Sequence, residues 1–437
     1  FISLEGIFLN RKERTEKVKE INLLDEAVGI IRQYFPQLLD MFQELTDARN
    51  QSYVTYEMKV IFMVRLMALM CEIKSMNGIS SEFNTDEAIQ NIAQICGTEL
   101  DEIPHHDTIN NVFETIEISE LEQIIKYIIT RLIRSKMLDK FKIRDKYYLV
   151  VVDGTGLAAS RVKYNDNCLT KKKTNKYGEE YIEYSTYVLE AKLVMGNMVF
   201  SIGTEFIENT DEKESKQDCE IKAFKRLAEK IKKEYPRLKI LISGDALYAS
   251  KSVIDICNEY GWKYIIRLKE GAIPTLYEEF ETVVKRENET QKENYECATN
   301  LDYRESKINV VRYTEMKKNI ATEFVYMTDL PITEKTIVNT VAVGRMRWKI
   351  ENEGFNIQKN GTFDIGHLYS RNQIAIKVHY LLIQIAHAIR QLLENGDITV
   401  KELKCKIKEI SHILKNTLIS RTLNLVAHSK MQLRFDE

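Results

Sequence analysis

The chain has 437 residues, of which 44% are hydrophobic and 29% charged, and its formal net charge is −2 at pH 7. Gly (17) and Pro (5) are too scarce for a collagen-like or Pro-rich disordered protein, and the nearest candidate for a membrane helix, residues 60–71, is short and contains Arg65, so we expect no membrane association. Seven cysteines without a C-x-x-C pair indicate a reducing compartment and argue against both a disulfide framework and a zinc site.

The first part of the chain is predicted to be helical, because apolar residues recur with a helical period over 23–34 and 116–132. Between these segments, two amphipathic stretches are separated by a break at Gly97. This order is compatible with a helix-turn-helix DNA reader and equally with plain helical packing. The adjacent His105 and His106 would point apart on a regular element, so we expect no metal site there.

From residue 147 the pattern changes to that of an α/β unit. The expected elements are strands at 147–152, 184–194 and 198–207, a helix at 219–234, a strand at 238–242, a helix at 251–260 and a strand at 264–268. The first strand is a continuous β-forming run, typical of a strand buried on both faces, and is predicted to end at Asp153. A hairpin is expected at Gly196-Asn197, and the strand at 238–242 leads into Asp245.

Residues 272–331 are predicted to form a β-rich insertion, with its clearest strands at 308–313 and 322–327. Helices are expected again at 338–359 and 372–394, and the tail carries a basic amphipathic helix at 400–414. The chain is therefore predicted to have an α/β fold, a mixed sheet flanked by helices.

Three acids occupy positions where such a fold exposes side chains. Asp153 and Asp245 follow buried strands, and the ligands of open α/β sheets gather at strand carboxyl ends. Glu351 is expected on the helix after the insertion, in an apolar stripe with Trp348 and one turn from Arg347. Burying an unpaired carboxylate there would be costly, so the position predicts a metal ion or a cation beside it.

Each acid also has a plainer interpretation. Asp153-Gly154 is a common turn pair, Asp245 could cap the helix that follows, and Glu351 could simply pair with Arg347. The combination of two acids at strand ends and a third on a later helix is harder to explain this way. It fits metal-dependent displacement at a phosphodiester, because Mg²⁺ prefers hard oxygen ligands.

The segments around these acids resemble the DDE transposases of bacterial insertion sequences. They are VVVDGT at 150–155, ISGDALYA at 242–249 and RWKIENEGFN at 347–356. The resemblance covers roughly residues 147–394. It implies a ribonuclease-H-like core in which Asp153, Asp245 and Glu351 bind two Mg²⁺ ions, for which Mn²⁺ can substitute.

The same resemblance implies the reaction and the partners. The enzyme would cleave double-stranded DNA at the terminal inverted repeats of its element and transfer the freed strand into target DNA. It would act as a homodimer in a synaptic complex, at the nucleoid in the bacterial cytoplasm.

One branch of this family carries a Tyr-Arg-Glu-Lys signature, whose Tyr, Arg and Lys grip DNA phosphates near the cut. Arg347 and Glu351 occupy their positions, whereas Gly344 stands at the Tyr position and Gln358 at the Lys position. The resemblance therefore implies a phosphate contact for Arg347. Further DNA-binding candidates are Lys359, one residue beyond the Lys position, and Arg267 and Lys269, which alternate along one strand.

The expected organisation has five regions. They are a helical N-terminal region for DNA-end recognition (1–140), the first part of the catalytic core (141–271), the β-rich insertion (272–331), the second part of the core with the Glu-bearing helix (332–394) and a C-terminal helical tail (395–437).

Other functions remain open. The chain could be a domesticated or inactive transposase that only binds DNA, or a ribonuclease-H-like nuclease without strand transfer. The Asp153-Gly154-Thr155-Gly156 run also resembles the first phosphate loop of sugar-kinase-like ATPases and touches the dinucleotide-binding fingerprint. We discount both, because no further Gly-rich loop follows Asp245 and polar, basic residues stand where a helix should begin.

Overall fold

The computed structural model describes residues 16, 20–209, 218–286, 294–397, 400–401, 405–424 and 433–435. The chain forms two compact units. One consists of residues 136–355, and the other combines residues 1–135 with residues 356–437. We call them the sheet unit and the helical unit and describe each by itself.

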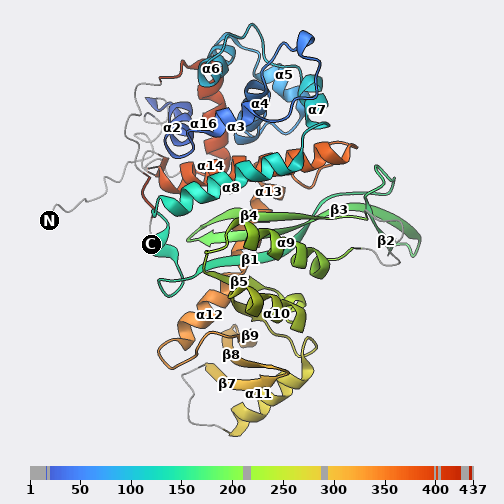
Figure 1. Cartoon of the computed structure of the whole chain (residues 1–437), viewed down its shortest axis with the longest axis vertical. Coiled ribbons are helices and arrows are strands. Elements are labelled where there is room, and N and C mark those ends of the chain that lie inside the picture. Colours follow the sequence, from blue (N-terminus) through green and yellow to red (C-terminus); the bar gives the residue numbers. More distant parts are fainter. Residues whose placement is uncertain are drawn as a thin grey trace, which may run out of the picture. The chain divides into compact units, whose positions relative to one another are not determined.

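The sheet unit is built on one mixed sheet (Figure 1). Its strands are β1 (Tyr148–Ser160), β2 (Leu169–Thr174), β3 (Glu180–Met195), β4 (Met198–Ile207), β5 (Ile240–Gly244), β6 (Lys263–Arg267), β7 (Tyr295–Tyr303), β8 (Ser306–Lys317) and β9 (Ile320–Thr328). Within the described residues the order is β2-β3-β1-β5-β6-β9-β8-β7, and β4 also pairs with β3.

The central strands have the expected ribonuclease-H-like arrangement. β3 and β4 form an antiparallel hairpin, β3 pairs antiparallel with β1, and β1, β5 and β6 run parallel. The hairpin turns at Gly196, whose φ of 60° lies in the left-handed region that favours glycine. Burial on both faces explains why β1 and β5 read as continuous apolar runs in the sequence.

The insertion differs from the β-rich unit that we expected over 272–331. It begins with a helix, α11 (Pro274–Arg286), and its three strands then continue the core sheet, because β9 pairs antiparallel with β6. This pairing satisfies the backbone hydrogen bonds along an edge of β6 that would otherwise be unpaired.

Helices cover both faces of the central strands. On one face lie α9 (Glu220–Glu234) and α10 (Lys251–Tyr260); Gly203 of β4 sits directly beneath Leu227 of α9. On the other face lie α12 (Ile337–Arg345) and a π-helix, η4 (Ile350–Phe355). The core between the sheet and α12 and η4 includes Leu149 and Val151 of β1. Short helical turns also occur as η2 (Asp139–Phe141) and η3 (Ala246–Tyr248).

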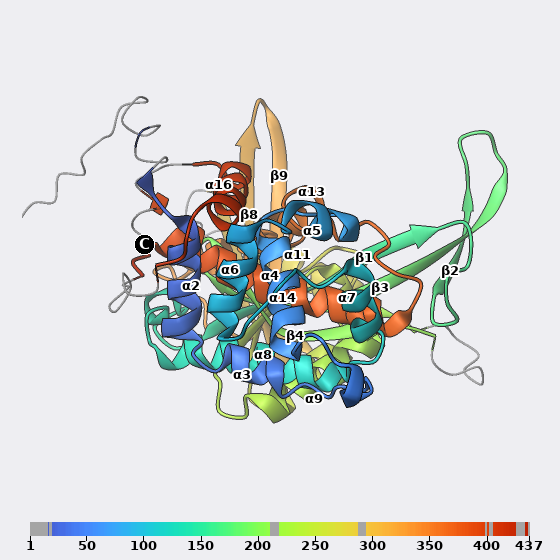
Figure 2. The same ribbon diagram turned by 90° about the horizontal axis from the view of Figure 1, so that it is seen from above.

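The helical unit is formed by segments from both ends of the chain. Its elements are α2 (Leu23–Tyr34), α3 (Leu38–Gln43), η1 (Gln51–Tyr53), α4 (Met58–Met70), α5 (Met76–Glu82), α6 (Asp86–Cys96), α7 (His106–Phe113), α8 (Ile118–Arg134), α13 (Asn356–Asn360), α14 (Gln373–Gly396) and α16 (Ile407–Ser420). The long helix α14 packs against α2, α4, α7 and α8 (Figure 2).

Two expectations about the last third of the chain differ from the structure. We grouped 332–394 with the catalytic core, but α14 is buried among the N-terminal helices, so the sheet unit ends at Phe355. The single helix expected over 338–359 is broken into α12, η4 and α13. Of the tail helix expected over 400–414, residues 400–401 are helical, residues 402–404 lie outside the described residues, and α16 begins at Ile407. None of the described helices combines the length and apolarity that crossing a membrane requires.

Candidate catalytic centre

Asp153 and Asp245 lie at the same level of the sheet. The parallel pairing of β1 with β5 ends at Val151 and Ser243, and each acid comes two residues after that last pair. Since side chains alternate along a strand, Asp153 shares the sheet face of Val151, which is the face covered by α12 and η4. The expectation that β1 ends at Asp153 is wrong, because its antiparallel pairing with β3 continues to Ser160.

Asp153 is held by two hydrogen bonds. Its Oδ2 accepts from the Arg347 guanidinium at 3.3 Å, and its Oδ1 accepts from the backbone N–H of Gly154 at 3.0 Å. Burial raises the pKa of Asp153 to about 6; Arg347 opposes this shift, whereas the carboxylates of Asp245 and Glu220 add to it. This coupling places the three acids in one electrostatic environment.

Asp245 follows β5 and caps the short helical turn η3. Its Oδ1 accepts from the backbone N–H of Leu247 at 2.9 Å. Asp245 is therefore a cap, but of this short turn and not of the helix expected at 251–260, whose N-cap is Ser250. One carboxylate oxygen still remains for another ligand, so the capping role and a metal-binding role are compatible.

Glu351 lies on the π-helix η4, which contacts β1 and β4. The expectation of an apolar stripe is wrong, because Glu351 is exposed and the Trp348 side chain is 51% exposed. The turn at 346–347 and the wider π-helix change which residues share a face. Arg347 consequently pairs with Asp153 and not with Glu351. π-Helical turns of this kind occur frequently at functional sites.

The basic candidates occupy different surroundings. Arg267 ends β6, donates to the backbone oxygen of Glu323 at 2.5 Å, and lies over the rings of Phe324 and Tyr326. Lys269 lies beyond the end of β6 and is exposed, so the two residues do not alternate along one strand. Lys359 is on α13, in the helical unit.

Glu220, the first residue of α9, was not predicted from the sequence. Its Oε2 accepts from the Tyr248 hydroxyl at 3.2 Å, and burial raises its pKa, with Asp245 adding to the shift. Burial and the neighbouring acids, Glu220 first, raise the pKa of Tyr248 well above its usual value. The sequence shows an acid at the start of a predicted helix, but only the topology brings that end of α9 next to β1.

A buried ion pair on β3 was not predicted from the sequence either. Glu190 lies directly opposite Asp153 in the β1–β3 ladder, and its carboxylate is 3.3 Å from the Lys192 ammonium. Both side chains are at most 1% exposed. Glu190 also accepts hydrogen bonds from Ser201, at 2.8 Å, and from Thr204. The sequence signal for this pair is a Glu and a Lys two residues apart, Glu190 and Lys192, within a mostly apolar part of β3.

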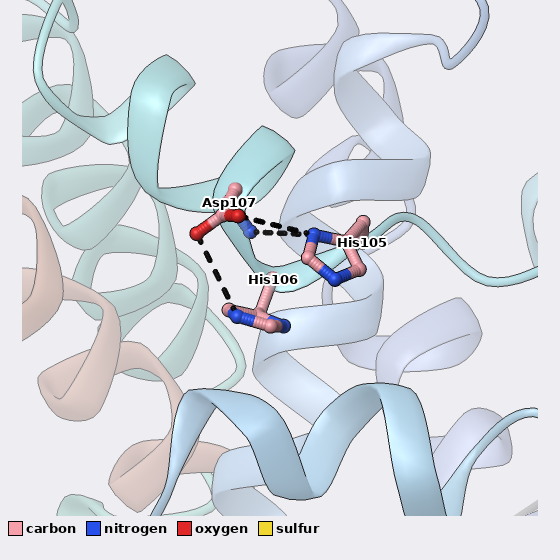
Figure 3. Close-up of side chains that lie close together, drawn as sticks. All are labelled: His105, His106 and Asp107. Carbon is pink, nitrogen blue, oxygen red and sulfur yellow. Dashed lines mark hydrogen bonds and ion pairs between the residues drawn. The ribbon is translucent and has the colours of Figure 1, made fainter.

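A second cluster of ligand-type side chains lies at the start of α7 (Figure 3). The rings of His105 and His106 are 3.9 Å apart, so the expectation that they point apart is wrong. Among the described residues, they and Asp107 are the one group of three whose ligand atoms all lie within 4.8 Å of one another. The carboxylate of Asp107 lies 3.4 Å from His105 and 3.6 Å from His106.

Two family models match parts of the chain. The family model described as Transposase DDE domain group 1 matches residues 208–436, more than half of the chain, and the model described as DDE_Tnp_1-associated matches residues 39–128. The curated proteins contain no match. A similar solved structure is the cryo-EM structure of a piggyBac transposase synaptic complex with hairpin DNA, at 10% identity and a TM-score of 0.43, covering 91% of this chain and 81% of that one.

Proposed function

The chain belongs to the DDE transposase family, and from that premise we propose that it cuts DNA at the ends of a mobile element and joins them to a target, using divalent metal ions held by Asp153, Asp245 and Glu351. The observation that carries this proposal is the placement of Asp153 and Asp245 at one level of the sheet, just beyond the last β1–β5 pair.

The donor set fits a hard divalent cation. The three acids offer carboxylate oxygens, which Mg²⁺ prefers and which Mn²⁺ also accepts. Bound there, a pair of Mg²⁺ ions would stabilise the attacking and leaving oxygens of an in-line displacement at phosphorus. Asp153 projects from β1 and Asp245 directly follows β5, whereas Glu351 comes from η4, the helical turn that packs on β1 and β4.

Arg347 has two roles in this proposal. Its guanidinium neutralises part of the charge on Asp153, to which it donates a hydrogen bond. Its planar group can also hold a phosphate oxygen pair in two parallel hydrogen bonds, which a Lys cannot do. Lys359, Arg267 and Lys269 are proposed as further phosphate contacts.

The remaining regions are assigned by the same proposal. The N-terminal region, residues 1–140 with helices α2 to α8, would recognise the terminal inverted repeats. Two copies of the chain would hold a pair of DNA ends in the synaptic complex, and target DNA would enter at the metal-binding acids. DNA cutting that requires Asp245 would distinguish this enzyme from an inactive relative that only binds DNA.

The test uses DNA that carries the ends of the element encoding the chain, with Mg²⁺ or with EDTA. The variant is Asp245→Asn, and the matched control is Asp255→Asn, an exposed acid on the neighbouring helix α10. We expect 3′-hydroxyl nicks at the element ends and joined products with Mg²⁺, lost with EDTA and in Asp245→Asn but retained in Asp255→Asn.

The other outcomes identify the alternatives. Cutting without joined products would replace the transposase proposal with a nuclease. End-specific binding without cutting, with Mg²⁺ or with Mn²⁺, would leave a protein that only binds DNA.

A further inference from the structure

Three consecutive residues at the start of α7 bring two imidazoles and a carboxylate together in the helical unit (Figure 3). His105 is the N-cap of α7, and His106 and Asp107 are the first two residues of the helix. Asp107 Oδ2 lies 3.4 Å from His105 Nδ1, and Asp107 Oδ1 lies 3.6 Å from His106 Nε2. Zn²⁺ and the neighbouring transition metals bind such a set of donors.

The separations between these atoms match ligands that share an ion better than they match hydrogen bonds. A charge-assisted N–H···O bond measures about 2.7–2.9 Å, so both separations are too long for one. Around a tetrahedral Zn²⁺, with bonds of about 2.0–2.1 Å, two ligand atoms lie about 3.4 Å apart. All three ligand atoms lie within 4.8 Å of one another, so a small rotation of these side chains would close the set around one ion.

A backbone hydrogen bond fixes which form His105 takes. Its Nδ1 accepts from the backbone N–H of Asp107 at 3.4 Å, so this nitrogen carries a lone pair and has no proton to donate to the carboxylate. The lone pair of Nδ1 and the charge of Oδ2 therefore face each other. Two electron-rich atoms in this position repel, and a cation bound between them would remove the repulsion.

His106 is oriented by a residue of another helix. Its Nδ1 lies 3.3 Å from the hydroxyl of Ser80 on α5, and its Nε2 is the nitrogen nearest Asp107. A metal-binding histidine usually has its second ring nitrogen hydrogen-bonded, because that contact fixes the ring and its tautomer. When Nδ1 donates to Ser80, Nε2 holds the lone pair that an ion needs.

The charge around the three side chains also suits a cation. A helix N-terminus carries roughly half a positive charge, which opposes a bound cation, but the Asp107 carboxylate contributes a full negative charge in the same turn. No Lys or Arg among the residues that the structure describes forms an ion pair with Asp107. The carboxylate is therefore not already neutralised by a basic side chain.

We propose that His105, His106 and Asp107 bind a divalent transition-metal ion of the Zn²⁺ class, and that Ser80 positions His106 for it. The site differs in chemistry from the proposed Mg²⁺ centre, because Mg²⁺ prefers oxygen ligands and avoids imidazoles. Three protein ligands leave the fourth position of a tetrahedral ion to water. A bound ion would fix the start of α7 and strengthen its attachment to α5.

The test is titration of the metal-free full chain with Co²⁺, followed by visible absorption, in excess Mg²⁺ and without DNA. Co²⁺ replaces Zn²⁺ in tetrahedral sites and is coloured there, and cysteine ligands would add a thiolate charge-transfer band. Excess Mg²⁺ occupies oxygen-only sites, so the result does not depend on the proposed function. His105→Asn removes an imidazole but keeps a favoured N-cap for α7. The matched control is His412→Asn, an exposed histidine on α16.

We expect one Co²⁺ per chain that Zn²⁺ displaces and Mg²⁺ does not, without the thiolate band. His105→Asn and His106→Asn should each weaken binding by about tenfold or more, and Ser80→Ala by about tenfold, with unchanged urea unfolding midpoints in the absence of metal. His412→Asn should bind as the unchanged chain does. Equal Co²⁺ affinity in His105→Asn, His106→Asn and the unchanged chain, or a thiolate band, would overturn the inference.

Discussion

The guanidinium of Arg347 lies 3.3 Å from the carboxylate of Asp153, although 194 positions separate the two residues in the chain. Arg347 is only 18% exposed and Asp153 22%. The contact joins the strand that begins the sheet unit to the segment that ends it. It also puts a fixed positive charge next to a proposed metal ligand. This charge should weaken metal binding and strengthen the contact with a DNA phosphate.

Replacing Arg347 by Gln is expected to change these two properties in opposite directions. Removing a cation beside the metal ligands should strengthen Mg²⁺ binding by about fivefold, which corresponds to roughly 1 kcal/mol of relieved repulsion. Cleavage of DNA should fall, because the phosphate contact is lost. Calorimetry and a nicking assay measure the two, with Arg304→Gln, an exposed arginine of the insertion, as control. Weaker Mg²⁺ binding in Arg347→Gln would contradict the expected repulsion.

Metal affinity should depend on pH through Asp153. Its pKa in the folded protein is about 6, raised from 3.8 chiefly by burial, so a proton competes with the metal below that pH. Mg²⁺ affinity should therefore rise between about pH 5 and about pH 7 and level off above. The free energy of unfolding changes in the opposite direction. Because the folded chain binds this proton more tightly than the unfolded chain, the contribution of Asp153 to stability falls as pH rises from about 4 to about 6. Mg²⁺ affinity that is constant over this range would show that Asp153 does not titrate there.

Gly154→Ala tests the packing of Glu220 on β1. Alanine fits an extended strand, but its Cβ would overlap the Glu220 carboxylate. We expect Gly154→Ala to lower the urea unfolding midpoint of the sheet unit, and Glu220→Ala, which removes the overlapping carboxylate, to recover part of that loss when it is added. Additive losses in this double-mutant cycle would mean that the glycine serves another purpose. Gly271→Ala, where a Cβ meets nothing within 4 Å, is the control.

Breaking the buried pair should unfold the sheet unit at lower denaturant concentration. Lys192→Met leaves Glu190 charged and buried, which typically costs about 3–5 kcal/mol. Adding Glu190→Gln removes that charge and should recover much of the loss, since an amide oxygen still accepts from Ser201. Urea unfolding measures both. The control Lys173→Met removes a surface pair with Glu183 and should cost no more than about 1 kcal/mol. A small loss in Lys192→Met would show that the pair contributes little.

Much of the sheet unit could be predicted from its sequence. The hairpin, α9 and the parallel strands produce strong local patterns, because apolar runs and alternation follow directly from burial. β2 was not predicted, because three consecutive lysines, Lys171 to Lys173, lack the pattern of a strand, yet their backbone pairs with β3. β2 forms because its backbone pairs with β3, and no pattern within the sequence of β2 itself predicts that pairing. The same reason explains why α14 could not be assigned to the helical unit.

The candidate centre was only partly predictable. Asp245 follows a recognisable strand and Asp153 lies within one, so their shared level in the sheet could be anticipated. Glu351 was identified by resemblance, but its exposure was not, because the π-helix changes the residues that share its face. Glu220 and the Arg347 contact depend on tertiary packing between elements far apart in the chain, and neither leaves a local signature.

The Glu190–Lys192 pair also has a consequence for how β3 aligns with β1. A slip of one residue would turn both charges to the opposite face of the sheet, among the apolar side chains of α9. Asp153 would then face a different neighbour on β3. Such a misaligned hairpin would be strongly destabilised. The buried pair therefore favours the strand alignment in which the candidate centre is correctly assembled.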